Sequence, residues 1–215
     1  SSFLIILLGL FDDMTKSETP MPNKYKWLVQ LIVAAIVVFY GGLELTKVTL
    51  FGLKLNFASI PLLPEALSIF IIIATINAIN LIDGLDGLCA GIASIYFLTV
   101  AIIGFILNKF GGLDIILCLI MLGSTLGYLV HNFPPARIYQ GDAGSTFLGF
   151  MISVIFLLGF KTTTLTSLII PLLILAIPIM DTLFAIIRRV INKKPIGEPD
   201  KKHLHHQLLN LNISH

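Results

Sequence analysis

Aspartates recur beside glycines and amides at the ends of apolar runs in this sequence. NAINLIDGLDGL carries Asp83 and Asp86, QGDAGS carries Asp142, and Asp12 with Asp13 follows the apolar opening of the chain. Mg²⁺ binds through one or two protein carboxylates and leaves its other positions to water and phosphate oxygens. These residues therefore predict a divalent-cation site that receives a phosphorylated substrate.

Basic side chains that bind phosphate occur in the same polar segments. They are Lys16, Lys26, Arg137, Arg188 and Arg189. Carboxylates alone would repel a phosphorylated substrate, whereas carboxylates with a divalent ion and basic groups would bind one. GDAGS opens an apolar run, so its amides would form a helix N-terminus that attracts anions. We infer a metal-dependent site for phosphoryl transfer at a membrane surface.

The elements that must position these residues are membrane spans. Of the 215 residues, 56% are hydrophobic and only 12% are charged, whereas soluble domains have about a quarter charged. Apolar runs of about 20 residues recur, enough to cross roughly 30 Å of hydrocarbon. We predict an all-α integral membrane protein, a polytopic helix bundle with about six full spans plus one partial, forming a single transmembrane catalytic domain over residues 1–215. The predicted spans are 27–40, 59–81, 88–107, 113–133, 146–160 and 167–187, with the partial span over 3–11.

The loops between the spans place the acidic residues on one face. Alternating Leu, Val and Phe around Phe51 and Gly52 predict a short extracytoplasmic β-hairpin. If the spans alternate in direction, every polar-rich loop lies on the side of the membrane opposite to this hairpin. That side also carries ten of the fourteen Lys and Arg residues. An excess of basic residues marks the cytoplasmic side. The aspartates would then avoid the membrane centre, where each costs about 2.5–3.5 kcal/mol.

Other classes are disfavoured by composition. The net charge is +2 and no basic cluster is interleaved with aromatics, so no nucleic-acid partner is expected. Cys89 and Cys118 fall inside apolar runs and are interpreted as packing residues. The chain opens SSFLIILLGLF, without an initiator Met and with half a span, so we expect it to begin part-way through a longer protein.

Five motifs carry a family resemblance: FDD, NAINLIDGLDGL, PPARIYQGDAGS, PIMDTLFAIIRR and HLHHQLL, in this order. With them the chain resembles the polyprenyl-phosphate N-acetylhexosamine-1-phosphate transferases of glycosyltransferase family 4, over nearly its whole length. The resemblance implies a multi-pass enzyme of the cytoplasmic membrane whose active site faces the cytoplasm. Such enzymes move a sugar 1-phosphate from a UDP-sugar to a polyprenyl phosphate, usually undecaprenyl phosphate, and release UMP. They depend on Mg²⁺, with Mn²⁺ as an alternative ion.

The resemblance also implies roles for individual residues. Asp142, with Asp12, would bind the metal. Asp12 or Asp13 would position or deprotonate the lipid phosphate, and which of them is the base stays open. The nucleotide pocket would contain Asn80, Asp83, Asp86 and Tyr139, the last stacked on uracil. Donor phosphate and sugar would be contacted by Arg188, Arg189 and the catalytic candidates His203, His205 and His206, beside the substrate-binding candidates Lys16, Lys26 and Arg137.

The histidine motif bears on the donor sugar. HLHH resembles the branch that uses UDP-N-acetylglucosamine and starts teichoic-acid, O-antigen or enterobacterial-common-antigen type polymers. The alternative is the phospho-N-acetylmuramoyl-pentapeptide transferase branch of peptidoglycan synthesis, which typically has three consecutive histidines followed by Phe-Glu. Relatives are commonly homodimers. They also carry two spans before the DD motif and at least one after the histidines, so we expect this chain to be cut at both ends.

Structural and functional alternatives remain at this stage. Asp12 and Asp13 could be a solvated helix end, and Asp83, Asp86 and Asp142 could cap spans. Likewise, Tyr139 and Lys26 could be anchors at the membrane interface. A transporter would place acids near span midpoints, often in a duplicated half, but here they lie at span ends and no repeat occurs. CDP-alcohol phosphotransferases need an Arg that DGLDGLCAG lacks. A scaffold for lipid-linked sugars would work without the metal.

Overall fold

The computed structural model of the chain describes residues 1–15, 21–50, 53–107 and 111–162, with Ala176, Met180, Phe184 and Ile187. This part is helical apart from one pair of strands. Its elements are α1 (Ser2–Thr15), α2 (Asn23–Ala35), the π-helix η1 (Ile36–Tyr40), β1 (Lys47–Leu50), β2 (Leu53–Asn56), α3 (Leu63–Ile82), α4 (Leu88–Ile106), α5 (Leu113–Asn132) and α6 (Gly141–Thr162). Apart from the four isolated residues, the predicted span 167–187 lies outside the described part.

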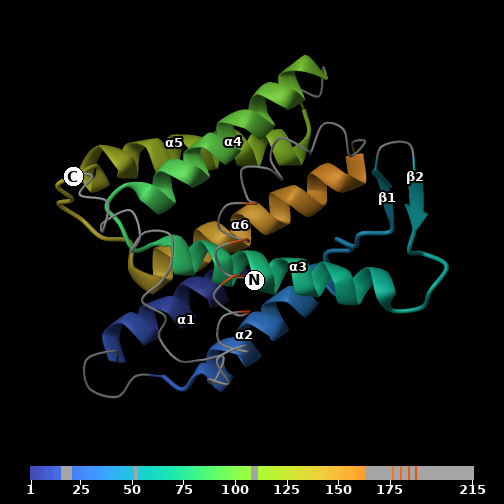
Figure 1. The fold of residues 1–215 in the computed structure, drawn as a ribbon, viewed down its shortest axis with the longest axis horizontal. Helices are drawn as coiled ribbons and strands as arrows, with labels where there is room; N and C mark the ends of the chain where they lie inside the picture. Colours follow the sequence, from blue (N-terminus) through green and yellow to red (C-terminus); the bar gives the residue numbers. More distant parts are fainter. Residues whose placement is uncertain are drawn as a thin grey trace.

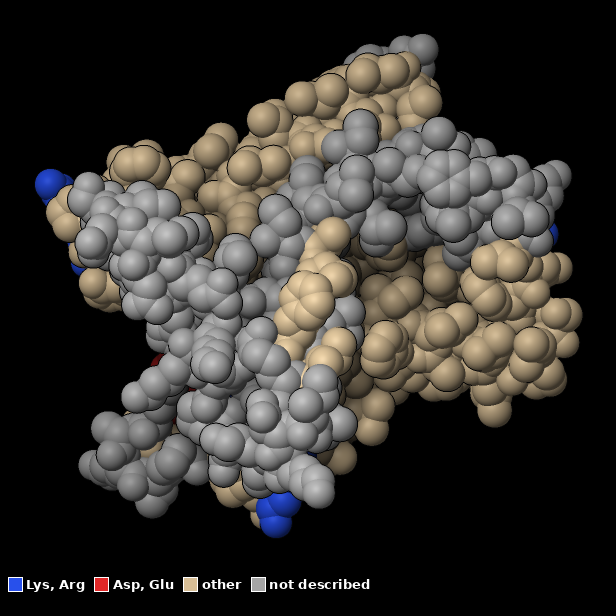
Figure 2. Space-filling model, viewed as in Figure 1, with Lys and Arg blue, Asp and Glu red and all other residues tan. Residues whose placement is uncertain are grey.

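Within the described residues, four helices are long and apolar enough to cross a membrane: α3, α4, α5 and the Gly141–Gly159 part of α6. Large apolar side chains lie on their outer faces, such as Phe70 and Val130, which are 68% and 77% exposed. On the face in Figure 2, uncharged residues form nearly all of the described surface, and Lys and Arg atoms lie at its margins. Such a surface matches a lipid environment, so the prediction of a polytopic all-α membrane protein is confirmed.

Helix α6 lies in the middle of the bundle and packs against α1, α3, α4 and α5 (Figure 1). Two glycines allow this close packing. A Cβ added to Gly149 of α6 would lie 2.7 Å from Ile76 Cα and 3.0 Å from the Thr75 carbonyl oxygen of α3. A Cβ added to Gly9 of α1 would lie 2.3 Å from Ala143 Cα at the start of α6. Small residues at such crossings are the usual means by which membrane helices approach closely.

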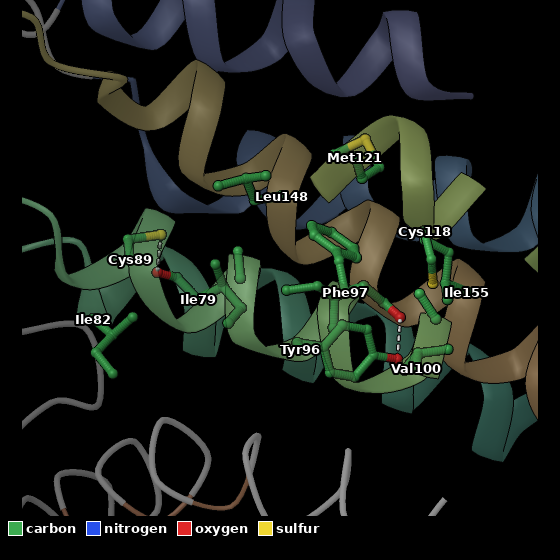
Figure 3. Packing of buried hydrophobic residues seen from close by; sticks show 13 residues of the cluster. Ile79, Ile82, Cys89, Tyr96, Phe97, Val100, Cys118, Met121, Leu148 and Ile155 are labelled. Atoms are coloured by element: carbon green, nitrogen blue, oxygen red, sulfur yellow. Dashed lines mark hydrogen bonds between the residues drawn. The ribbon is translucent and has the colours of Figure 1, made fainter. Parts of the chain in front are cut away.

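Two apolar clusters fill the bundle. The first joins α3, α4, α5 and α6, and the second joins α1, α2 and η1 to α3 and α6. Figure 3 shows Tyr96 and Phe97 inside the first cluster, where the Tyr96 hydroxyl donates a hydrogen bond to the Ile152 carbonyl oxygen at 3.3 Å. Cys89 and Cys118 are free, buried thiols in this cluster. Their interpretation as packing residues is therefore confirmed.

The two strands pair antiparallel, with Lys47 opposite Asn56 and Leu50 opposite Leu53. They occupy the segment whose alternating apolar residues predicted a hairpin, and the connecting residues 51–52 lie outside the described part. The strands follow the α2–η1 helix and precede α3. They therefore precede the N-terminus of α3, whereas Asp83 lies at its C-terminus.

One predicted boundary is wrong. The span expected over 146–160 corresponds to α6, which begins at Gly141 and so includes GDAGS in its first turns. The Gly144 N–H donates to the Gln140 carbonyl oxygen at 2.9 Å, and the Ser145 hydroxyl donates to the Gly141 carbonyl oxygen at 2.9 Å. The motif therefore forms the helix N-terminus, as predicted for its amides, but the helix begins five residues before the expected start of the span.

We expect Gly149→Ala to destabilise the bundle, because the new methyl group would meet the backbone of α3. Overpacking of this kind costs about 1–3 kcal/mol. Gly123→Ala on α5 is the matched control, since an added Cβ there meets nothing within 4 Å and alanine favours a helix by about 1 kcal/mol. Thermal unfolding in detergent should give a lower midpoint for Gly149→Ala and an unchanged or higher one for Gly123→Ala. Equal midpoints would contradict the α3–α6 contact.

Candidate active site

Three charged side chains from different helices meet at one end of the bundle. Asp12 lies in the last turn of α1, Lys26 lies near the start of α2, and Asp142 lies in the first turn of α6. The Lys26 Nζ atom lies 2.5 Å from Asp12 Oδ2 and 3.7 Å from Asp142 Oδ2. Asp12 is only 2% exposed. A buried carboxylate without its partner is strongly destabilising, so the contact with Lys26 stabilises the ionised form of Asp12.

The environment of Asp12 favours its protonated form. Burial raises the pKa of the Asp12 carboxyl above its ordinary value of 3.8, and a hydrogen bond with Asp142 raises it further, whereas Lys26 lowers it. Two carboxyls this close disfavour ionisation of both. A bound cation would reverse this preference, because opposite charge favours the ionised carboxylate.

Asp13, the next residue, points to a different partner. Its Oδ1 accepts a hydrogen bond from the Asp142 N–H at 2.9 Å, and its Oδ2 accepts one from the Ala143 N–H at 3.0 Å. Gly141, with φ of +61°, begins the helix in a conformation that side chains rarely adopt. The GDAGS amides were predicted to form a helix N-terminus that attracts an anion, and the anionic group that binds the Asp142 and Ala143 amides is the Asp13 side chain.

Asn80 of α3 is another contact of Asp142. Its Nδ2 atom donates to Ser145 Oγ at 2.8 Å and to Asp142 Oδ1 at 3.2 Å. Asn80 was expected in the nucleotide pocket, and the structure places it against the predicted metal ligand. Helices α1, α2, α3 and α6 therefore all contribute to one polar group around Asp142.

A second polar contact lies one turn deeper and was missed by the sequence analysis. Asn77 Nδ2 donates to Gln30 Oε1 at 2.7 Å and to the Ile73 carbonyl oxygen at 2.8 Å. Gln30 is buried. The available signal was spacing, because Gln30 follows Lys26 by four residues and Asn77 precedes Asn80 by three, on the same helix faces.

The α3–α4 turn is bound to the loop after α5. Asp86 Oδ2 accepts a hydrogen bond from the Ala136 N–H at 2.9 Å, and Asn132 Oδ1 accepts one from the Gly87 N–H at 3.0 Å. Asp83 is the C-cap residue of α3. Gly87, with φ of +75°, is the N-cap residue of α4, and no side-chain hydrogen bond caps that helix. The alternative in which Asp83 and Asp86 cap α4 is therefore wrong. Asn132 is a further residue that the sequence analysis missed.

The loop between α5 and α6 presents the predicted base-stacking residue. Tyr139 is 76% exposed and Arg137 is also exposed, so both side chains face outward from the bundle. Their predicted contacts with a substrate stay predictions. The remaining predicted site residues lie outside the described part of the chain; they are Lys16, Arg188, Arg189, His203, His205 and His206.

The residues present fit a divalent cation. No three His, Cys, Asp or Glu side chains among the described residues gather closely enough to hold one, but Mg²⁺ requires only one or two carboxylates. Asp12 and Asp142 supply two. In the same described part, Asp12 Oδ1 is buried and has no hydrogen-bond partner. Such an atom is costly to leave unsatisfied, and a cation ligated there would satisfy it.

Known proteins similar to this chain include several transferases. The sequence profile described as glycosyl transferase family 4 matches residues 1–160. A probable undecaprenyl-phosphate N-acetylglucosaminyl 1-phosphate transferase of Bacillus subtilis is 44% identical over 100% of this chain and 58% of its own length. A decaprenyl-phosphate N-acetylglucosaminephosphotransferase of Mycolicibacterium smegmatis is 32% identical over 99% and 56%, respectively.

A more distant relative belongs to the alternative branch. A phospho-N-acetylmuramoyl-pentapeptide-transferase of Thermotoga neapolitana is 32% identical over 97% of this chain and 67% of its own length. The chain thus spans roughly half to two thirds of the length of these curated relatives. Because the profile covers most of the chain and the Bacillus subtilis relative matches all of it, the chain belongs to glycosyl transferase family 4.

Proposed function

We propose that the protein transfers N-acetylglucosamine 1-phosphate from UDP-N-acetylglucosamine to a polyprenyl phosphate such as undecaprenyl phosphate, with release of UMP. The observation that carries the proposal is the Asp12–Lys26–Asp142 group at one end of membrane-crossing helices. A lipid acceptor requires a site at the membrane, and a water-soluble donor requires that the site be open to an aqueous compartment. The excess of Lys and Arg in the loops predicted on this side supports the cytoplasm as that compartment.

The reaction is an exchange at the donor β-phosphorus. An oxygen of the lipid phosphate forms a bond to that phosphorus, the bond to the bridging oxygen breaks, and the electron pair leaves with UMP. Phosphoryl transfer of this kind depends on positioning and on neutralising charge. When bound, Mg²⁺ supplies charge neutralisation for the donor diphosphate and for the departing UMP.

The chain's own residues would divide this work. Asp12 and Asp142 would hold the metal, and Asn80 keeps the Asp142 carboxylate in place through its hydrogen bond. Lys26 reaches both carboxylates and would also reach a phosphate oxygen near them. Burial raises the pKa of the Asp12 carboxyl above its ordinary value, and a raised pKa makes the ionised carboxylate a stronger base for exchanging a proton with the lipid phosphate.

Transfer of label from donor to lipid tests the proposal. We expect the purified protein to move radiolabelled N-acetylglucosamine 1-phosphate onto undecaprenyl phosphate with Mg²⁺, and to stop when EDTA is added. The matched arm supplies the UDP-N-acetylmuramoyl-pentapeptide donor. Transfer from that donor alone would replace the proposed function with the alternative branch, and no transfer from either donor would reject both.

Asp142→Asn should reduce the Mg²⁺-dependent release of UMP by on the order of 100-fold or more. The substitution keeps an oxygen that accepts from Asn80 but removes the charge that would bind the metal. Glu44→Gln, a half-buried acid outside the site, is the control and should retain turnover. Undiminished UMP release by folded Asp142→Asn would remove this residue from the metal site.

Tyr139→Ala should raise the KM for the UDP-sugar by at least about fivefold, since stacking on an aromatic ring contributes about 1–3 kcal/mol per base. Tyr139→Phe keeps the ring and should keep the KM. Initial rates at varied donor concentration separate the two variants. An unchanged KM for Tyr139→Ala would leave this exposed ring without a role in donor binding.

A further inference from the structure

We propose that Asp13 is a positioning residue, which holds the first turn of α6 against α1 so that Asp142 faces Asp12, and that it neither ligates the metal nor serves as the catalytic base. This inference rests on the proposed function, because it concerns the metal site of that reaction. It assigns different tasks to two adjacent carboxylates that the sequence alone does not distinguish.

The contacts of Asp13 are those of a helix cap supplied by another helix. Its two oxygens each accept one backbone N–H, from Asp142 and Ala143, at 2.9 and 3.0 Å. The first four N–H groups of a helix have no partner within the helix, and a carboxylate at this end is favoured by the helix dipole. Any movement of Asp13 toward a metal would break these two bonds and leave those amides unsatisfied.

The junction between α1 and α6 leaves little room for other arrangements. Gly9 precedes Asp13 by four residues, so both lie on the α1 face that meets α6. A Cβ at Gly9 would lie 2.3 Å from Ala143 Cα, and a Cβ at Gly141 would collide with the Asp13 carboxylate. The two glycines thus allow α6 to start where the Asp13 side chain reaches its amides.

Asp12 differs from Asp13 in every one of these respects. It is paired with Lys26 and lies beside Asp142, and its Oδ1 is buried without a hydrogen-bond partner among the described residues. It therefore has an oxygen available for a cation. Since Asp13 binds the backbone of Asp142 itself, it fixes where the second carboxylate of the pair begins.

Direct binding of Mn²⁺, followed by electron paramagnetic resonance on the purified protein in nanodiscs, tests this assignment. A residue that only orients a metal ligand typically affects metal affinity by about 10–100-fold. We expect Asp13→Ala to raise the Mn²⁺ Kd within this range. Asp13→Asn, which keeps one acceptor oxygen, should raise the Kd less and should regain turnover to within a few-fold of wild type at saturating Mn²⁺.

Two further variants separate positioning from other roles. Gly141→Ala removes no carboxylate, but its added Cβ would displace the Asp13 carboxylate from the α6 amides. This variant should therefore also raise the Mn²⁺ Kd. Thr99→Ala on α4 removes a hydroxyl that donates to the Ile95 carbonyl oxygen one turn earlier, away from the site, and it should match wild type in binding and turnover. An unchanged Kd for Gly141→Ala would contradict the positioning role.

The remaining outcomes are distinct. Asp13→Asn with a wild-type Kd and no turnover at saturating Mn²⁺ would make Asp13 the base and overturn the inference. Loss of Mn²⁺ binding as complete as in Asp12→Asn, without recovery of turnover, would make it a ligand and also overturn it. If either of these two results appears while wild type still transfers sugar phosphate, the inference about Asp13 fails and the proposed function stands. If wild type neither binds Mn²⁺ nor transfers, the proposed function and this inference both fail.

Discussion

The close approach of α6 to its neighbours is the constraint on which the site depends. Asp142 is placed by the start of this helix, and the helix can lie against both α1 and α3 only because Gly9 and Gly149 carry no side chain. In a membrane, where lipid is as apolar as leucine, such close contacts and buried hydrogen bonds replace the hydrophobic drive that packs soluble helices. The same contacts that hold the bundle together therefore also set the distance between the acidic groups.

Placing several carboxylates at one end of an apolar bundle creates an electrostatic problem, and each acid meets it differently. Asp12 pairs with Lys26, Asp13 binds the amides of α6, and Asp86 accepts from Ala136. Among the described residues, backbone N–H groups and Lys26 thus stabilise this negative charge. Asp12 is the acid whose burial raises its pKa and whose Oδ1 has no hydrogen-bond partner within the described chain. Asp12 is therefore the acid suited to bind a cation, whereas Asp13 and Asp86 hold segments of the backbone together.

Much of the fold follows from the sequence, because span length and hydropathy are local properties. The predicted spans 88–107 and 113–133 agree with α4 and α5 to within a residue at each end. The meeting of Asp12, Lys26 and Asp142 followed from loops that share one face. The division between Asp12 and Asp13 could not be predicted, because neighbours on a helix point about 100° apart and the choice of partner depends on packing.

Other features depend on residues far apart in the chain. The carboxylate that caps α6 comes from Asp13, 129 residues before Asp142, so the local signal that placed GDAGS at a helix N-terminus could not identify its cap. The bond between Gln30 and Asn77 spans 47 residues. Their spacing from Lys26 and Asn80 indicated shared helix faces, but two faces meet only once the helices are packed.

The Gln30–Asn77 contact also constrains how this sequence can change over generations. The Asn77 amide donates to the side-chain oxygen of the buried Gln30 between α2 and α3. If one of them is replaced by an apolar residue, its partner loses a hydrogen bond, and an unsatisfied buried polar group costs about 1–3 kcal/mol of folding stability. Exchanging both for an apolar pair of the same shape is nearly neutral. Among descendants of this chain the two positions should therefore covary, remaining amides together or turning apolar together, with mixed combinations rare.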